Sequence, residues 1–97
     1  MTIPISLGLD FGTESVRAIL VSAEGQQLGL ASDNYAHGQI IDTLPGRSDP
    51  LPPRYALQDP NDWIESAIRA TRAAINAAGV QADDVVGIGV DFTSCTM

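Results

Sequence analysis

The fold of this chain is decided by residues 7–17, which read LGLDFGTESVR. An apolar run reaches Asp10, turns sharply and returns as a second apolar run. A carboxylate at the end of a buried strand is costly unless another charge offsets it, and a divalent metal ion would do so. Gly8 and Gly12 lack a Cβ, so a ligand can approach the main chain closely there, and Gly12 can adopt a positive φ. The stretch therefore predicts two strands joined by a turn that is open to a ligand.

The turn offers the groups that a magnesium–nucleotide phosphate needs. Successive backbone N–H groups in such a turn can form an anion-binding concavity, and Thr13 and Ser15 add hydroxyl donors beside it. Magnesium prefers oxygen ligands and keeps several waters, so Asp10 can hold it directly or through water. The same residue types also build plain β-hairpins, in which Asp10 and Gly12 only form the turn. Spacing alone leaves both interpretations open.

Composition and charge narrow the classes of function. The chain has 97 residues, which fits one small domain, and 44% of them are hydrophobic. It contains 5 basic residues, all arginine, against 12 acidic ones, for a formal net charge of −7. The absence of lysine excludes a Walker A loop. The acidic balance argues against nucleic acid and against an anionic membrane surface as partners.

Targeting signals are not evident in the sequence. The first residues have neither a basic start nor a long apolar core, so no signal peptide is predicted. No apolar run is long enough to span a bilayer. Cys95 is the only cysteine, and a lone thiol fits a reducing cytoplasm. It is either a small buried filler or a thiol that lines a ligand. One histidine and one cysteine provide no ligand cluster for zinc.

Period-two patterning predicts three strands in the first third of the chain. Residues 3–10 alternate, with Asp10 opposite the Ile/Leu face. Residues 15–22 are apolar almost throughout, which predicts a strand that is covered on both faces. Residues 28–32 form a weaker strand, where Gly29 indicates a sheet edge or a bulge.

Two polar residues in this region have open roles. Arg17 interrupts the second strand as either a phosphate contact or an ion-paired arginine. Repeated prolines predict that residues 33–59 are irregular, and a loop of this length is usually functional or mobile. His37 lies near its start and is either a hydrogen-bonded surface residue or a ligand or base.

A long helix should follow this loop. Asp59 suits the N-cap, Pro60 suits the first helical position and Gly79 suits the C-terminal glycine. The predicted buried face is Ile64, Ala67, Ile68, Thr71, Ile75 and Ala78.

The run over residues 85–91 reads VVGIGVD and predicts a buried strand. Because it comes after a helical crossover, it should be parallel to its neighbour. If its neighbour is the first strand, Asp10 and Asp91 lie at one edge of the sheet, where α/β sheets bind ligands. This pair allows phosphoryl transfer, with Asp10 holding magnesium. It also allows a two-metal nuclease or phosphatase of ribonuclease H topology, although the negative charge opposes a polyanionic substrate.

Three motifs carry a resemblance to a known family. Residues 10–13, DFGT, resemble the first phosphate loop of the sugar kinase, actin and heat-shock chaperone ATPase superfamily, and with ESVRA (14–18) they are similar to the start of FGGY-type carbohydrate kinases. Residues 56–63 resemble the motif that opens the long helix of these kinases. Residues 87–97, GIGVDFTSCTM, closely resemble the corresponding segment of L-ribulokinases. The resemblance implies an α/β fold with a ribonuclease H-like (actin/hexokinase superfamily) mixed sheet in β-β-β-α-β order.

The resemblance also implies an activity and a set of sites. It implies ATP-dependent phosphorylation of ribulose to ribulose 5-phosphate with Mg²⁺. The implied nucleotide contacts, with Asp10 also at the metal, are Asp10, Gly12, Thr13, Ser15 and Arg17. The implied sugar contacts are Asp91, Thr93, Ser94 and Cys95. Ser94 is the strongest candidate among them, because a small side chain leaves room for a ketopentose.

The length of the chain departs from this family. FGGY kinases have two domains and are several times longer, so residues 1–97 are expected to be the N-terminal part of the first domain. The general base and the adenosine pocket are then expected outside these residues, and this chain alone should be inactive. We expect the full kinase to be a cytoplasmic homo-oligomer that binds sugar and ATP but neither nucleic acid nor membrane. The alternatives are another FGGY sugar kinase, such as one for xylulose, and a non-catalytic nucleotide-binding module.

Overall fold

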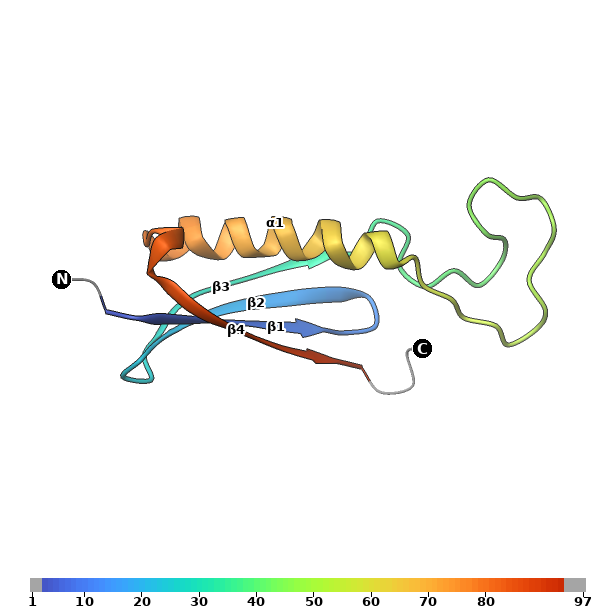
Figure 1. Cartoon of the computed structure of the whole chain (residues 1–97). Coiled ribbons are helices and arrows are strands. Elements are labelled where there is room, and N and C mark those ends of the chain that lie inside the picture. The colour runs from blue at the N-terminus through green and yellow to red at the C-terminus, as the bar shows by residue number, and fades with distance from the viewer. Residues whose placement is uncertain (1–2, 94–97) are drawn as a thin grey trace.

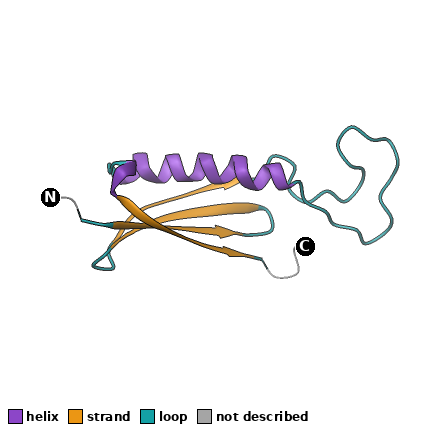
Figure 2. Cartoon of the chain, in the orientation of Figure 1, coloured by secondary structure: helices purple, strands orange, loops and turns teal. Residues whose placement is uncertain are grey.

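A four-stranded mixed sheet carries one long helix on one of its faces (Figures 1 and 2). The structure is a computed structural model that describes residues 3–93. Its elements are β1 (Ile5–Phe11), β2 (Ser15–Ser22), β3 (Gln27–Asn34), α1 (Pro60–Ala78), the short 3-10 helix η1 (Ala82–Asp84) and β4 (Val85–Phe92). This order confirms the predicted α/β class and its β-β-β-α-β sequence of elements.

The strands lie in the order β3-β2-β1-β4. Two antiparallel hairpins join β1 to β2 and β2 to β3, and β4 returns parallel to β1 after the helical crossover. The predicted parallel pairing is therefore confirmed. Gly29 predicted a sheet edge or a bulge, and β3 has both: it is an edge strand, and its register with β2 shifts between Leu20 and Val21. Among residues 3–93, no helix has the length and apolar character needed to cross a membrane.

The core lies between α1 and one face of the sheet. Its buried side chains are Ile5, Leu7, Phe11, Val16, Ala18, Leu20, Tyr35, Ala70 and Ala74. Burial alternates along β2, and Arg17 is exposed on the opposite face. The prediction that this strand is covered on both faces was wrong, because α1 packs on only one face of the sheet in the described part of the chain.

The predicted burial of the last strand was also wrong. β4 is exposed along nearly its whole length, with Val86 71% and Ile88 64% exposed. The reason is that α1 packs chiefly over β2 and β3, so it leaves β4 uncovered at the other edge. An exposed apolar edge strand is a template for pairing with another chain.

The predicted buried face of α1 was wrong at Ile64 and Ile68, whereas Ala67, Ile75 and Ala78 pack against the core as predicted. The residues that pack most closely on the sheet are small, namely Ser66, Ala70 and Ala74. Ile64 is 62% exposed and Ile68 is 45% exposed. Small side chains decide the face because they allow the helix backbone to approach the sheet closely.

Gly29 on β3 marks the closest approach between the helix and the sheet. A Cβ at this position would lie 2.7 Å from the Ala74 carbonyl oxygen and 2.9 Å from the Ala78 Cβ. Gly29→Ala should therefore lower the free energy of unfolding by about 1–3 kcal/mol, because the helix must move. Gly87→Ala is the matched control, since its Cβ would meet nothing within 4 Å. Equal losses in the two variants, measured by urea denaturation, would refute this account.

The segment between β3 and α1 is irregular, as predicted, although β3 itself continues to Asn34. Two isolated bridges, Ile40 with Leu57 and Thr43 with Pro50, bring its two halves together. The loop extends beyond the end of the sheet at which α1 begins (Figure 1).

Candidate functional site

Three charged side chains form a row across the sheet at the end where β1 and β4 finish. Asp10 on β1 is the register partner of Asp91 on β4 and of Arg17 on β2. Asp10 and Arg17 alternate with side chains that α1 covers, so they lie on the face opposite α1. Asp91 lies on the same face as Asp10, because the two are register partners. The prediction that the two aspartates share one edge of the sheet is confirmed.

Electrostatics couple the members of this row. The Arg17 Nε donates to Asp10 Oδ2 at 3.1 Å, and its Nη2 bonds the same oxygen. These hydrogen bonds lower the pKa of Asp10, and a hydrogen bond with Asp91 lowers it further. The same hydrogen bond, followed by burial and the Asp10 charge, raises the pKa of Asp91. Two carboxylates that share a hydrogen bond favour a shared proton or a cation between them.

A hollow of about 410 Å³ opens beside the row. It is lined by the three charged residues and by Gly8, Leu9, Ile19, Leu30, Gly89 and Val90. Gly8 lines the hollow without a side chain, and a Cβ there would lie only 3.0 Å from Ile19 Cγ2. Charged groups at one end and apolar groups at the other suit a ligand with an anionic part and an apolar part.

The turn between β1 and β2 adjoins this row. The Gly12 N–H donates to the Ser15 carbonyl at 2.8 Å, which closes the turn. Gly12 is not among the glycines with positive φ, which are Gly25, Gly38, Gly46 and Gly79. Gly12 therefore does not use the left-handed conformation that a glycine permits. The glycine serves close packing instead, since its Cβ would lie 3.2 Å from the Ser15 carbonyl oxygen.

The end of β4 is tied to the end of β1. The Thr93 N–H and hydroxyl both donate to the Phe11 carbonyl, at 2.9 and 3.0 Å. The ring of Phe92 stacks on that of Phe11 with 4.8 Å between centroids. The chain after Asp91 thus starts beside the β1–β2 turn. Ser94 and Cys95 lie outside the described residues, so their sugar contacts stay predictions.

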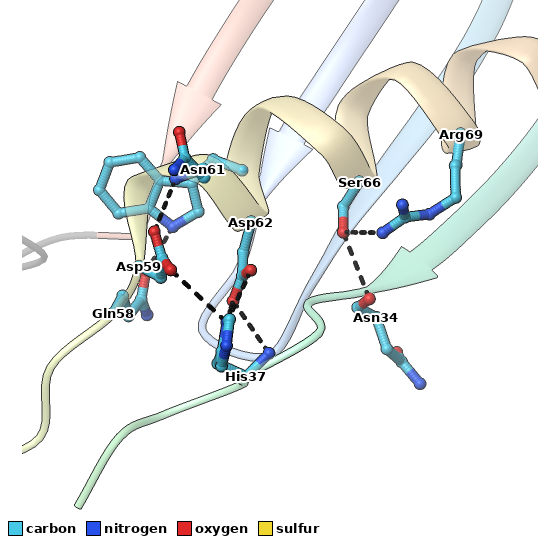
Figure 3. A network of polar contacts seen from close by, with 9 residues as sticks. Asn34, His37, Gln58, Asp59, Asn61, Asp62, Ser66 and Arg69 are labelled. Atoms are coloured by element: carbon cyan, nitrogen blue, oxygen red, sulfur yellow. Dashed lines mark hydrogen bonds and ion pairs between the residues drawn. The ribbon is translucent and has the colours of Figure 1, made fainter. Parts of the chain in front are cut away.

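A second polar cluster lies where the long loop meets α1 (Figure 3). The His37 N–H donates to Asp62 Oδ2 at 2.9 Å, and its Nδ1 lies 3.0 Å from Asp62 Oδ1. Asp59 Oδ2 is 3.6 Å from the same ring nitrogen. His37 was predicted to be either a hydrogen-bonded surface residue or a ligand or base. The structure shows a hydrogen-bonded residue. Its partner Asp62 lies in the first turn of α1, and its side chain is only 4% exposed. No sequence pattern linked it to His37.

His37 should make stability depend on pH. The Asp62 hydrogen bond raises the pKa of His37 above 6.5, and the nearby charges of Asp62, Asp59 and Glu65 raise it further. A raised pKa in the folded state stabilises the fold below the unfolded pKa, and this contribution is lost as the pH rises through the folded pKa. His37→Gln should therefore cost stability below about pH 6.5, and the difference from the unmodified chain should shrink above it.

Urea denaturation at a series of pH values measures this difference. Asp62→Asn removes the partner and should abolish the same pH-dependent part. A difference between His37→Gln and the unmodified chain that stays constant from pH 5 to pH 9 would refute the assignment.

Comparisons with known proteins define the class. The profile of the N-terminal domain of the FGGY family of carbohydrate kinases matches residues 5–95. The chain belongs to this family. A sugar kinase structure from Brucella ovis, described as a xyloylose kinase, superposes with a TM-score of 0.71 at 27% identity and covers 92% of this chain and 16% of that one. The predicted similarity to the actin/hexokinase-like fold of these kinases is confirmed.

The curated relatives that match this chain include several ribulokinases. The ribulokinase of Geobacillus thermodenitrificans is 45% identical over 91 residues, which cover 94% of this chain and 16% of the relative. The ribulokinase of Mycolicibacterium smegmatis is 46% identical over 93 residues, with the same coverage. The ribulokinase of Halalkalibacterium halodurans is 45% identical over 98 residues, which cover 100% of this chain and 17% of the relative. The chain thus spans 16–17% of the length of these relatives.

Proposed function

We propose that residues 1–97 form the N-terminal part of the first domain of a longer, cytoplasmic sugar kinase. The proposed reaction transfers the γ-phosphoryl group of ATP to the 5-hydroxyl of ribulose. The pairing of Asp10 with Asp91 beside the turn carries the proposal, because it supplies carboxylates and backbone donors at one place. Identity of about 45% to ribulokinases over nearly the whole chain supports the substrate.

The residues of the row fit a magnesium ion. Mg²⁺ takes oxygen ligands and keeps several waters, and Asp10 and Asp91 offer carboxylate oxygens on an exposed face. Asp10 would hold the ion, directly or through water. When bound, Mg²⁺ neutralises charge on the phosphate oxygens. Arg17 forms an ion pair with Asp10. Its guanidinium would be a second positive group beside the phosphates, in addition to the magnesium ion.

The turn is proposed to hold the phosphates. Gly12 presents bare main chain, while Thr13 and Ser15 add hydroxyl donors on either side of the tip. Phosphoryl transfer depends mainly on positioning and charge stabilisation, so a preformed turn of donors contributes directly.

The segment after β4 is proposed to face the sugar through Asp91, Thr93, Ser94 and Cys95. In this arrangement the Thr93 hydroxyl bonds the Phe11 carbonyl, so Thr93 also directs the segment toward the turn. A general base must lie within hydrogen-bond reach of the sugar hydroxyl. The proposal assigns that base to another part of the longer kinase.

A coupled ADP-release assay on the full-length kinase tests the function. We expect sugar-dependent turnover with Mg²⁺, the highest kcat/KM with ribulose, and no turnover from the 97-residue chain alone. The second candidate is a kinase for xylulose, which the Brucella ovis neighbour favours. It would give the highest kcat/KM with xylulose. ATP hydrolysis that does not depend on any sugar would reject both.

A further inference from the structure

Two segments that are distant in the sequence hydrogen-bond the carbonyl groups at the tip of the β1–β2 turn. The Tyr35 hydroxyl donates to the Gly12 carbonyl at 2.9 Å, and the Tyr35 N–H donates to the Glu14 carbonyl at 2.9 Å. The Gln58 Nε2 donates to the Thr13 carbonyl at 3.1 Å. Three successive carbonyl oxygens of the turn are therefore occupied by donors from elsewhere in the chain.

These bonds fix the direction of the N–H groups of the turn. A trans peptide is planar, so its C=O and N–H groups point in opposite directions. No peptide bond of the described chain is cis. Holding the carbonyls of Gly12 and Thr13 thus turns the N–H groups of Thr13 and Glu14 away from Tyr35 and Gln58. Donors that are already aimed need no reorganisation when an anion arrives.

Gln58 is itself held in place. The Trp63 Nε1 donates to the Gln58 Oε1 at 2.7 Å, so the amide nitrogen is the end that faces Thr13. Trp63 lies in the first turns of α1, and its ring meets Phe92 edge-on with 6.3 Å between centroids. Gln58 therefore connects the turn to the start of α1 and, through Trp63, to the end of β4.

Tyr35 is held by the core. Its side chain is buried among the core residues beside the end of β3. Burial raises the pKa of its hydroxyl, and the charge of Asp10 raises it further. The hydroxyl therefore keeps its proton and remains a donor to Gly12.

We propose that Gln58 and Tyr35 are positioning residues that aim the N–H groups of Thr13 and Glu14 at the nucleotide phosphates. This rests on the proposed kinase function. The two residues act through the turn and do not touch the nucleotide. They contact the turn from positions 23 and 45 residues away along the chain.

Two variants of the full-length kinase separate positioning from packing. Gln58→Glu keeps an acceptor for Trp63 but loses the donor to Thr13. Tyr35→Phe keeps the buried ring but loses the donor to Gly12. Each should raise KM for MgATP about 3- to 10-fold, as expected for one lost hydrogen bond, and leave KM for the sugar within about twofold. Gln27→Glu and Tyr55→Phe make the same changes at exposed positions and should leave both constants unchanged.

Calorimetric titration with MgADP gives a readout that does not need sugar turnover. The dissociation constant should rise 3- to 10-fold in Gln58→Glu and in Tyr35→Phe. If the unmodified kinase binds MgADP but phosphorylates no sugar, the proposed function fails, while weaker binding by the variants still supports the positioning role. The positioning role would be overturned by any of three results. The MgADP affinity could be unchanged in both variants, or the KM values for MgATP and for sugar could change equally. The unmodified kinase could also bind no nucleotide.

Discussion

Asp10→Asn in the full-length kinase should lower kcat/KM for sugar phosphorylation about 10²- to 10³-fold. The substitution keeps the size of the side chain but removes the negative charge that we propose holds magnesium beside the phosphates. Losses of this size are typical when one preorganised electrostatic group is removed from an active site. The coupled ADP-release assay with ribulose at several magnesium concentrations measures it.

The matched control for this variant is Asp49→Asn. Asp49 forms an exposed ion pair with Arg47 on the long loop. Asp49→Asn therefore also removes the charge partner of an arginine, but at a site away from Asp10, Arg17 and Asp91. It should change kcat/KM by less than twofold. An Asp10→Asn enzyme with near-normal activity would show that the row on the sheet does not carry the chemistry.

Leu20→Ala should cause the largest loss of stability among single core truncations. Leu20 lies on β2 and is the largest fully buried side chain of the described core. Removing it leaves a cavity beneath α1, and substitutions of this kind cost about 2–5 kcal/mol. Small domains have a total stability of only about 5–15 kcal/mol, so this variant should be close to unfolding at room temperature.

Leu30→Ala is its control, because Leu30 lies on β3 and is 53% exposed. It should cost less than about 1 kcal/mol. Equilibrium unfolding in guanidinium chloride compares the two. Similar losses in Leu20→Ala and Leu30→Ala would mean that α1 does not bury the face of the sheet on which Leu20 lies.

Local signals were sufficient to predict the order of the elements. Asp59 caps α1 by accepting from the Asn61 N–H at 3.0 Å, and Gly79 ends the helix with a φ of 69°. Both residues act within a few positions of themselves, which is why a sequence pattern can reveal them. The helical crossover predicted that β4 is parallel to its neighbour. The structure shows that this neighbour is β1, which places Asp10 beside Asp91.

The errors arose where burial depends on distant parts of the chain. Hydrophobic periodicity placed Ile64 and Ile68 in the core, whereas the close fit to Gly29 requires the small residues of the helix there. The apolar composition of β4 predicted burial, but composition does not say which strands a helix will cover.

Polar links between distant segments were also missed. Tyr35 and Gln58 reach the turn across 23 and 45 residues, and His37 reaches Asp62 across 25. A side chain that hydrogen-bonds a backbone carbonyl carries no periodic pattern. The one available signal was that Gln58 lies next to the helix cap, in the segment that resembles the family motif.

The location of the bound metal tests the central claim most directly. Crystals of the full-length kinase with Mn²⁺ and ADP would locate the manganese by the change in anomalous signal across its absorption edge. We expect the peak beside Asp10, at direct or water-mediated distance, with the nucleotide phosphates against residues 12–15. A peak at His37, Asp59 and Asp62 instead, whose ligand atoms lie within 4.8 Å of one another, with the phosphates away from the turn, would contradict the account.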